Sequence, residues 1–208
     1  MRSSRTRRRS TSSWPSRRWI ASHRRRSTGS RTAADGSAGI EAKHLPTAWR
    51  GIVAGIAVGG CLTWNISNVG AVADPLANTY GVSVAAVGLL TTSLFVTHLL
   101  AQLPAGRGAD RFGARTVALA AIAAAVAGNA LLVADDVFSL ALLGRAVVGL
   151  GSGAGFIAGL DLVRAGGGGR VLQGFYGGAT MAGGGLALMI VPPLTDATGW
   201  RAPYWTAA

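Results

Sequence analysis

Residues 106–115 read Gly-Arg-Gly-Ala-Asp-Arg-Phe-Gly-Ala-Arg, a short charged stretch between two long apolar segments. Three arginines and one aspartate are gathered here, whereas Ala, Leu and Val dominate on either side. Basic side chains favour the water beside a bilayer over its hydrocarbon core. The stretch therefore predicts a short connection between two helices that cross a membrane.

Five apolar segments follow the N-terminal region, each about 20 residues long, the length that a helix needs to cross the hydrocarbon core. Within them, His98 and Arg145 are the only side chains that carry charge near neutral pH. Helices that pack on the core of a soluble protein keep a polar face toward water, so we predict an all-α membrane protein with five full transmembrane helices and the start of a sixth. The predicted spans are 51–72, 84–105, 116–134, 137–160 and 171–194, with the start of the sixth at 203–208.

The charged stretch resembles the signature loop between the second and third helices of the major facilitator superfamily. Gly108 and Ala114 depart from that pattern. The resemblance covers residues 49–208 and implies the N-terminal half of a transporter that usually has two six-helix halves. The positions that match are Gly106, Ala109, Asp110, Arg111, Gly113 and Arg115.

The resemblance implies alternating access, in which two helix bundles rock around a site near the bilayer midplane. The signature loop would control the cytoplasmic gate, with Asp110 facing a helix N-terminus in the other half, where a negative charge is favoured. Because no second half is visible in the sequence, we expect a truncated chain. The alternative is a non-transporting or regulatory membrane protein that needs a partner half.

Loop charges predict the orientation independently of the resemblance, because basic residues near helix ends favour the cytoplasmic side. The connections that carry Arg107, Arg111 and Arg115, and then Arg164 and Arg170, alternate with connections that carry Asp74 or Asp135 and Asp136. The N-terminus is therefore expected in the cytoplasm. We expect the protein to lie in the plasma membrane.

Residues 1–47 form an Arg- and Ser-rich extension, with eleven arginines and no acidic residue in residues 1–31. Its composition predicts disorder. An export signal, a transit peptide, a segment that binds anionic headgroups and a start site assigned too early remain open as alternatives. Nucleic-acid binding is not expected, because no recognised fold accompanies the arginines.

Four polar residues inside the spans are candidates for a substrate or proton pathway. Asn65 and Asn68 share a face of the first span, and they either join helices by hydrogen bonds or line a cavity. His98 is either a structural histidine or a proton site. Arg145 is costly within a membrane unless it is paired or hydrated, so it either lines the pathway or extends toward the outer interface.

Arg145 is followed by Gly149, Gly151 and Gly153, which predict close helix packing. Arg145, Gly149 and Gly151 resemble the fourth-helix pattern of the same family, in which the arginine is associated with proton coupling. Val148 departs from that pattern at a position that is often polar. The resemblance therefore supports the fold more firmly than it supports proton antiport.

The function expected from these features is transport of a small solute by a secondary transporter driven by an ion gradient, with protons as the expected ion. No catalytic set, metal-ligand cluster or nucleotide fingerprint appears in the sequence, so neither an enzyme nor a cofactor is expected. The glycines at 166–169 lack the Lys and Ser/Thr of a phosphate-binding loop. The expected partners are the lipid bilayer, a small-molecule substrate, and a second six-helix half or a second copy.

Overall fold

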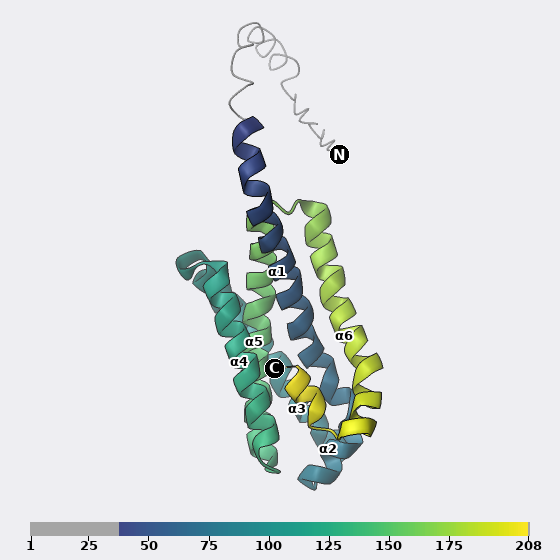
Figure 1. Ribbon diagram of the computed structural model, residues 1–208. Coiled ribbons are helices and arrows are strands. Elements are labelled where there is room, and N and C mark those ends of the chain that lie inside the picture. The colour runs from purple at the N-terminus through teal and green to yellow at the C-terminus, as the bar shows by residue number, and fades with distance from the viewer. Residues whose placement is uncertain (1–37, 208) are drawn as a thin grey trace, which may run out of the picture. The chain divides into compact units, whose positions relative to one another are not determined.

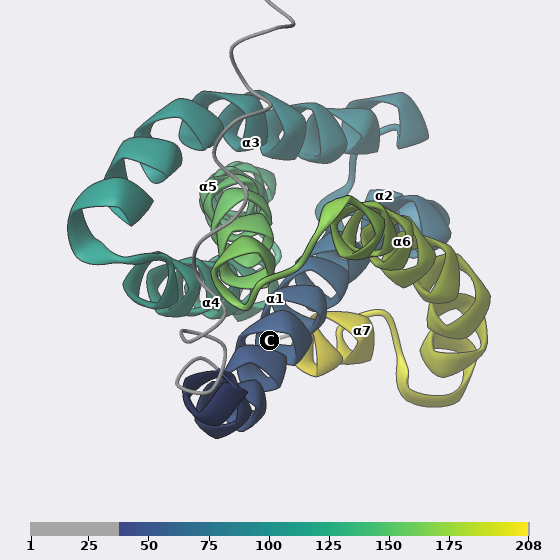
Figure 2. The same cartoon turned by 90° about the horizontal axis from the view of Figure 1, so that it is seen from above.

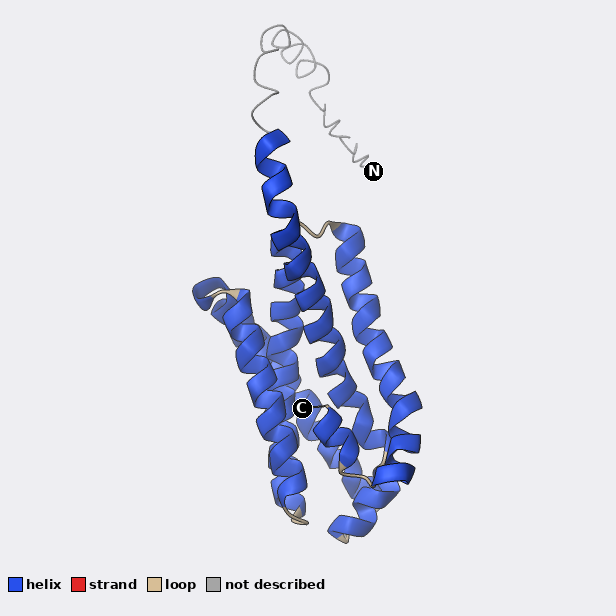
Figure 3. Cartoon of the chain, viewed as in Figure 1, coloured by secondary structure: helices blue, strands red, loops and turns tan. Residues whose placement is uncertain are grey.

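The structure, a computed structural model, describes residues 38–207, and all regular elements in that part of the chain are helices (Figure 3). Figure 1 labels them along the chain. They are α1 (Ala38–Ala71), α2 (Ala73–Tyr80), α3 (Val84–Phe112), α4 (Ala114–Ala134), α5 (Phe138–Ala165), α6 (Arg170–Thr198) and α7 (Ala202–Thr206).

Five of these helices are long and apolar enough to cross a membrane. They are Ala48–Ala71 within α1, and the whole of α3, α4, α5 and α6. The prediction of an all-α membrane protein with five full spans is confirmed, and α7 lies where the sixth was expected to start.

The predicted extension, residues 1–47, falls mostly outside the described residues. Its last part, residues 38–47, is the beginning of α1. Residues His44–Ala208 form one compact unit, to which the packing described below belongs.

Helix α5 lies at the centre of this unit, between α3, α4 and α1 (Figure 2). Glycines allow the close approach. A Cβ atom on Gly144 would lie 2.6 Å from the carbonyl oxygen of Gly128 on α4, and a Cβ on Gly128 would lie 2.5 Å from that of Gly144. Small residues let helix backbones touch in this way, which compensates for the missing hydrophobic drive between helices in lipid.

The glycines after Arg145 face two different neighbours. The backbone of α3 at Leu94 and His98 lies directly against Gly149 and Gly153. A Cβ on Gly151 would instead lie 2.6 Å from the carbonyl oxygen of Ala121 on α4. Glycines at alternating positions of α5 therefore pack against α3 and α4 in turn.

Several helices extend beyond their predicted spans, and α3 and α6 are two of them. Residues 106–112 are the last turns of α3 and not a loop, because no residue before Gly113 breaks the helix. Gly113 alone connects α3 to α4 and has φ +85°, a conformation that favours glycine. Helix α6 continues past Pro192 to Thr198, because a proline in a membrane helix removes one backbone donor without ending the helix.

The end of the bundle that contains α2 is held by aromatic packing. Tyr80 packs edge-on against Phe138 at the start of α5 and against Trp200 before α7, with ring centroids 5.9 Å apart in both pairs. Its hydroxyl donates to the carbonyl oxygen of Leu132 at 2.8 Å. One side chain thus joins α2, α4, α5 and the α6–α7 connection.

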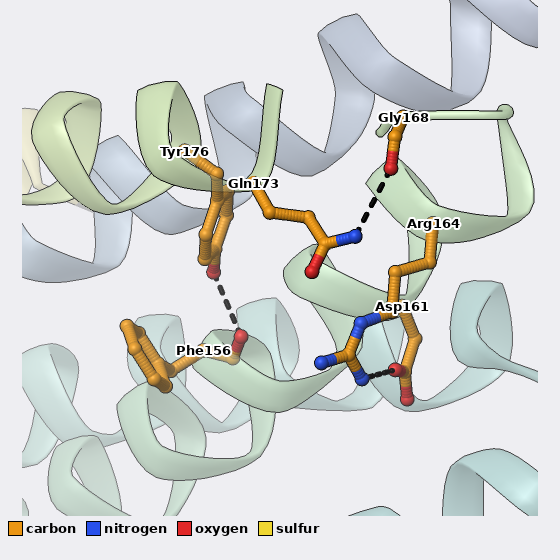
Figure 4. Close-up of polar contacts among 6 residues, drawn as sticks. All are labelled: Phe156, Asp161, Arg164, Gly168, Gln173 and Tyr176. Carbon is orange, nitrogen blue, oxygen red and sulfur yellow. Dashed lines mark hydrogen bonds and ion pairs between the residues drawn. The ribbon is translucent and has the colours of Figure 1, made fainter. Parts of the chain in front are cut away.

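At the opposite end, polar contacts fasten α5 to α6 (Figure 4). The hydroxyl of Tyr176 on α6 donates to the carbonyl oxygen of Phe156 on α5 at 2.7 Å. Gln173 donates to the carbonyl oxygen of Gly168 at 3.1 Å. The glycine-rich connection between α5 and α6 is therefore held to the helix that follows it.

Candidate functional site

The most unusual buried group is the guanidinium of Arg145, whose side chain is 0% exposed. Helix α5 directs it toward α1, where Nη2 donates to the backbone carbonyl of Asn65 at 2.5 Å. Nε and Nη1 are buried without a hydrogen-bond partner in the described part of the chain. Arg145 therefore does not extend toward the outer interface, which was one of the two alternatives for its side chain.

Amide side chains of α1 and α4 surround that contact. Asn65 accepts a hydrogen bond from Asn129 of α4 at 2.7 Å and donates to the carbonyl oxygen of Ala207 at 3.1 Å. Asn68, one turn further along α1, is fully buried, and neither end of its amide has a partner among residues 38–207. Asn65 therefore joins helices by hydrogen bonds, which was one of the two alternatives for this face of α1. The amide of Asn68 remains without a hydrogen-bond partner in the described chain.

Tyr204 completes the cluster from α7. It is fully buried near Arg145, and its hydroxyl finds no partner in the described chain. The cluster of Asn65, Asn68, Asn129, Arg145 and Tyr204, which we call the Arg145 cluster, therefore contains more unpaired donors than acceptors. Such a group suits an anion.

His98 lies outside the Arg145 cluster. Its Nδ1 is 2.9 Å from the hydroxyl oxygen of Ser152 on α5, and its ring packs against Phe95 and Phe156. It lines a separate cavity of about 200 Å³. The structure thus joins Arg145 to Asn65, places Asn68 one turn further along the same helix, and places His98 in a second site.

The signature segment lies at the end of α3, away from both sites. Asp110, Arg111, Gly113 and Arg115 are exposed, and Gly106 is partly buried. The guanidinium of Arg111 lies 5.1 Å from the ring centroid of Phe112. Asp110 forms no ion pair with any residue that the structure describes.

A wide apolar groove of about 850 Å³ lies between α1 and α6. Trp64 and Cys61 of α1 line it together with Phe175 and Leu186 of α6, and Thr206 and Ala207 also contribute to the lining. The groove contains little polar surface, so it differs in character from the Arg145 cluster.

Sequence reasoning missed Asn129, Ser152 and Tyr204. Asn129 had a detectable signal, because it is the only polar side chain of α4 beyond the first turn. Ser152 lies among glycines and resembles a packing residue. Tyr204 lies in the short helix α7, where the sequence gives no periodicity that would predict which face is buried.

Two comparisons with known proteins bear on this arrangement. The family model described as Major Facilitator Superfamily matches residues 53–208, which is more than half of the chain and includes all five spans in whole or in part. A search of curated proteins finds no match. The family points to a transporter rather than an enzyme, and the chain belongs to the Major Facilitator Superfamily, as an integral membrane protein of a family that carries out membrane transport.

Proposed function

We propose that this protein transports a small anion across the plasma membrane by alternating access, with protons as the coupling ion and its N-terminus in the cytoplasm. The Arg145 cluster is the substrate site in this proposal. The alternating loop charges support the orientation. The family supports the transport cycle at the level of mechanism.

One observation carries the choice of an anion. Arg145 is fully buried within a membrane span, and no carboxylate of the described residues pairs with it. A buried, unpaired charge costs several kcal/mol in a protein interior. A bound anion would offset that cost, and Nε, Nη1, the Asn68 amide and the Tyr204 hydroxyl are the groups available to hold it.

The cluster is closed in this conformation, because the unpaired atoms are shielded from solvent. A substrate therefore reaches Arg145 only when α1 and α5 separate locally. That requirement fits a transport cycle, in which the same site opens to each side in turn.

The signature segment supports the placement of the cytoplasmic gate. Gly113 allows a tight turn, and Asp110 is exposed without a partner in the described bundle. We propose that Asp110 contacts the N-terminus of a helix in a second bundle, where a negative charge is favoured. The second bundle is either another six-helix half or a second copy of this chain.

The test uses the full chain in lipid nanodiscs with acetate, inorganic phosphate and chloride as probes. An anion that binds only the folded protein raises its unfolding temperature by mass action. We expect stabilisation by at least one anion, its loss in Arg145→Gln, and its retention in Arg164→Gln, a matched control on the exposed part of the same helix. Equal stabilisation of all three proteins, or of none, would refute the anion site.

Uptake of the stabilising anion into proteoliposomes with an imposed pH gradient tests the transport step separately. We expect uptake that depends on the gradient and is lost in Arg145→Gln. Binding without uptake would instead favour a non-transporting protein that requires a partner half.

A further inference from the structure

The second polar site of the bundle is the cavity beside His98. It lies between four helices, with Thr63 from α1, Phe95 from α3, Phe156 from α5 and Met181 from α6 among its lining residues. Ser152, which contacts His98, comes seven positions after Arg145 on α5, about 10 Å along the helix axis. The two sites are therefore separate but belong to the same helix.

The hydrogen bonds of Ser152 define where the histidine carries its proton. The Ser152 hydroxyl is 3.1 Å from the carbonyl oxygen of Gly149 and 2.9 Å from Nδ1 of His98. A hydroxyl has a single proton, and a carbonyl can only accept. If Ser152 donates to Gly149, it accepts from His98, so the neutral ring has its proton on Nδ1.

Nε2 is then the basic nitrogen of His98. It has no hydrogen-bond partner among the described residues, and the ring lines the cavity. The hydroxyl of Thr63 is not available to it, because that hydroxyl donates to the carbonyl oxygen of Gly59 in its own helix at 2.8 Å. A proton delivered through the cavity thus meets one unoccupied acceptor.

The lining of the cavity contains no other charged side chain that would compete for the proton. The residues that α1, α5 and α6 contribute to the cavity are uncharged. Tyr176 of α6 packs behind Phe156, and its hydroxyl donates to a backbone carbonyl (Figure 4). The charged residues of α5 closest to the cavity lining are Asp161, five positions after Phe156, and Arg145, seven positions before Ser152.

We propose that His98 binds the coupling proton at Nε2, and that Ser152 is the positioning residue that keeps the other proton on Nδ1. This inference rests on the proton coupling in the proposed function. The imidazolium adds a positive charge beside Ser152, which lies about 10 Å along the α5 axis from Arg145. A charge at about that distance from a bound anion strengthens its binding on the order of tenfold if the effective dielectric constant is about 20. Proton and anion would then load together.

The test is a nitrogen NMR titration of the full chain, labelled with ¹⁵N-histidine, in lipid nanodiscs. The chain has three histidines, so His98→Gln identifies the signal of interest. We expect the Nδ1–H tautomer in the neutral ring and protonation of Nε2 between about pH 5 and pH 8. A neutral ring with its proton on Nε2, or a ring that does not titrate in this range, would overturn the proposal.

Ser152→Ala tests the positioning role, because it removes only the hydroxyl. We expect a shift of the neutral ring toward the Nε2–H tautomer. Thr63→Val removes a hydroxyl from the same cavity that does not touch His98, and it should leave the tautomer unchanged. An unchanged tautomer in a folded Ser152→Ala protein would contradict the assignment. If that variant does not fold, the tautomer measured in the wild-type protein tests the assignment by itself.

Neither measurement requires an anion or transport. A failure of the Arg145 site, seen as absence of anion stabilisation, is therefore distinguishable from a failure at His98. The link between the sites has its own readout, since anion affinity should rise about tenfold on acidification in the wild type and stay constant in His98→Gln.

Discussion

Adjacent residues of α5 face two different kinds of interface. Gly144 contacts α4 so closely that the backbones touch, and that interface is satisfied by packing alone. Arg145 faces α1, where a buried charge meets a single carbonyl and several unpaired polar groups. At this level of the bundle, the α4 side of α5 is held by packing, whereas the α1 side contains polar groups without partners in the described chain.

The difference has a physical basis. In lipid, tightly packed small residues hold helices together, and every unpaired polar group weakens the fold. A helix that has small packing residues and unpaired polar groups at neighbouring positions can tolerate the polar groups because the packing is strong. The comparison predicts opposite responses to substitution on the two sides.

The largest effect is expected for Gly144→Leu. A Cβ there would lie 2.6 Å from the Gly128 oxygen and 2.9 Å from the Leu132 nitrogen, and backbone atoms cannot move aside. We expect loss of the folded monomer, measured by size-exclusion chromatography in detergent. Gly185→Leu is the matched control, because no atom lies within 4 Å of its Cβ position, and its stability should stay within about 1 kcal/mol of the wild type.

Arg145→Met should act in the opposite direction. It replaces the buried charge with an apolar chain, which removes the cost of several kcal/mol for an unpaired charge in the interior. The unfolding temperature without anions should therefore stay the same or rise, while stabilisation by anions is lost. A marked decrease in stability would mean that Arg145 is a structural element, and the contrast between the two faces of α5 would not hold.

A smaller effect is expected for Tyr80, which lies at the end of the bundle that contains α2. Burial, reinforced by the negative charge of Asp136, raises the pKa of Tyr80 from 10.0 to about 12. The neutral hydroxyl therefore stabilises the fold fully below about pH 10, and this contribution is lost as pH rises toward 12.

Tyr80→Phe removes that contribution. At neutral pH it should cost about 1 kcal/mol through the lost bond to the Leu132 carbonyl. Unfolding measured as a function of pH should then show a shallower alkaline decline than in the wild type. Tyr176 and Tyr204 are present in both proteins, so the difference isolates Tyr80. Identical alkaline profiles would contradict the assignment.

The smallest effect is expected for Asp136→Asn. Asp136 and Arg201 form an exposed ion pair between the α4–α5 and α6–α7 connections. Exposed pairs contribute about 0–1 kcal/mol, and salt screens them. A larger change in the free energy of unfolding would show that this end of the bundle depends on charge rather than on aromatic packing.

The sequence predicted the spans well because their signal is long and uniform. The end of α3 was not predicted, because charged residues mark the membrane surface and not the end of a helix. Only Gly113, with its positive φ, ends it. No prediction was made for the glycines at 51, 55 and 59, although they follow the spacing that brings membrane helices together, and Gly55 lies against Gly159.

The site was predictable only in part. Arg145 and the amides of α1 were identified because polar groups in apolar segments are costly. Their partners depend on which helices are neighbours, and a single sequence does not contain that information. The bonds from Asn65 to Asn129 and to Ala207 cross 64 and 142 positions of the chain.

The single residue Gly113 has a mechanical consequence. A connection of one residue has no slack, so α3 cannot slide without carrying α4, and both are packed against α5. These three helices are expected to behave as a rigid block. Any rearrangement of the bundle is then concentrated at the boundary between this block and the pair α1 and α6, which is the boundary that Arg145 and His98 both face.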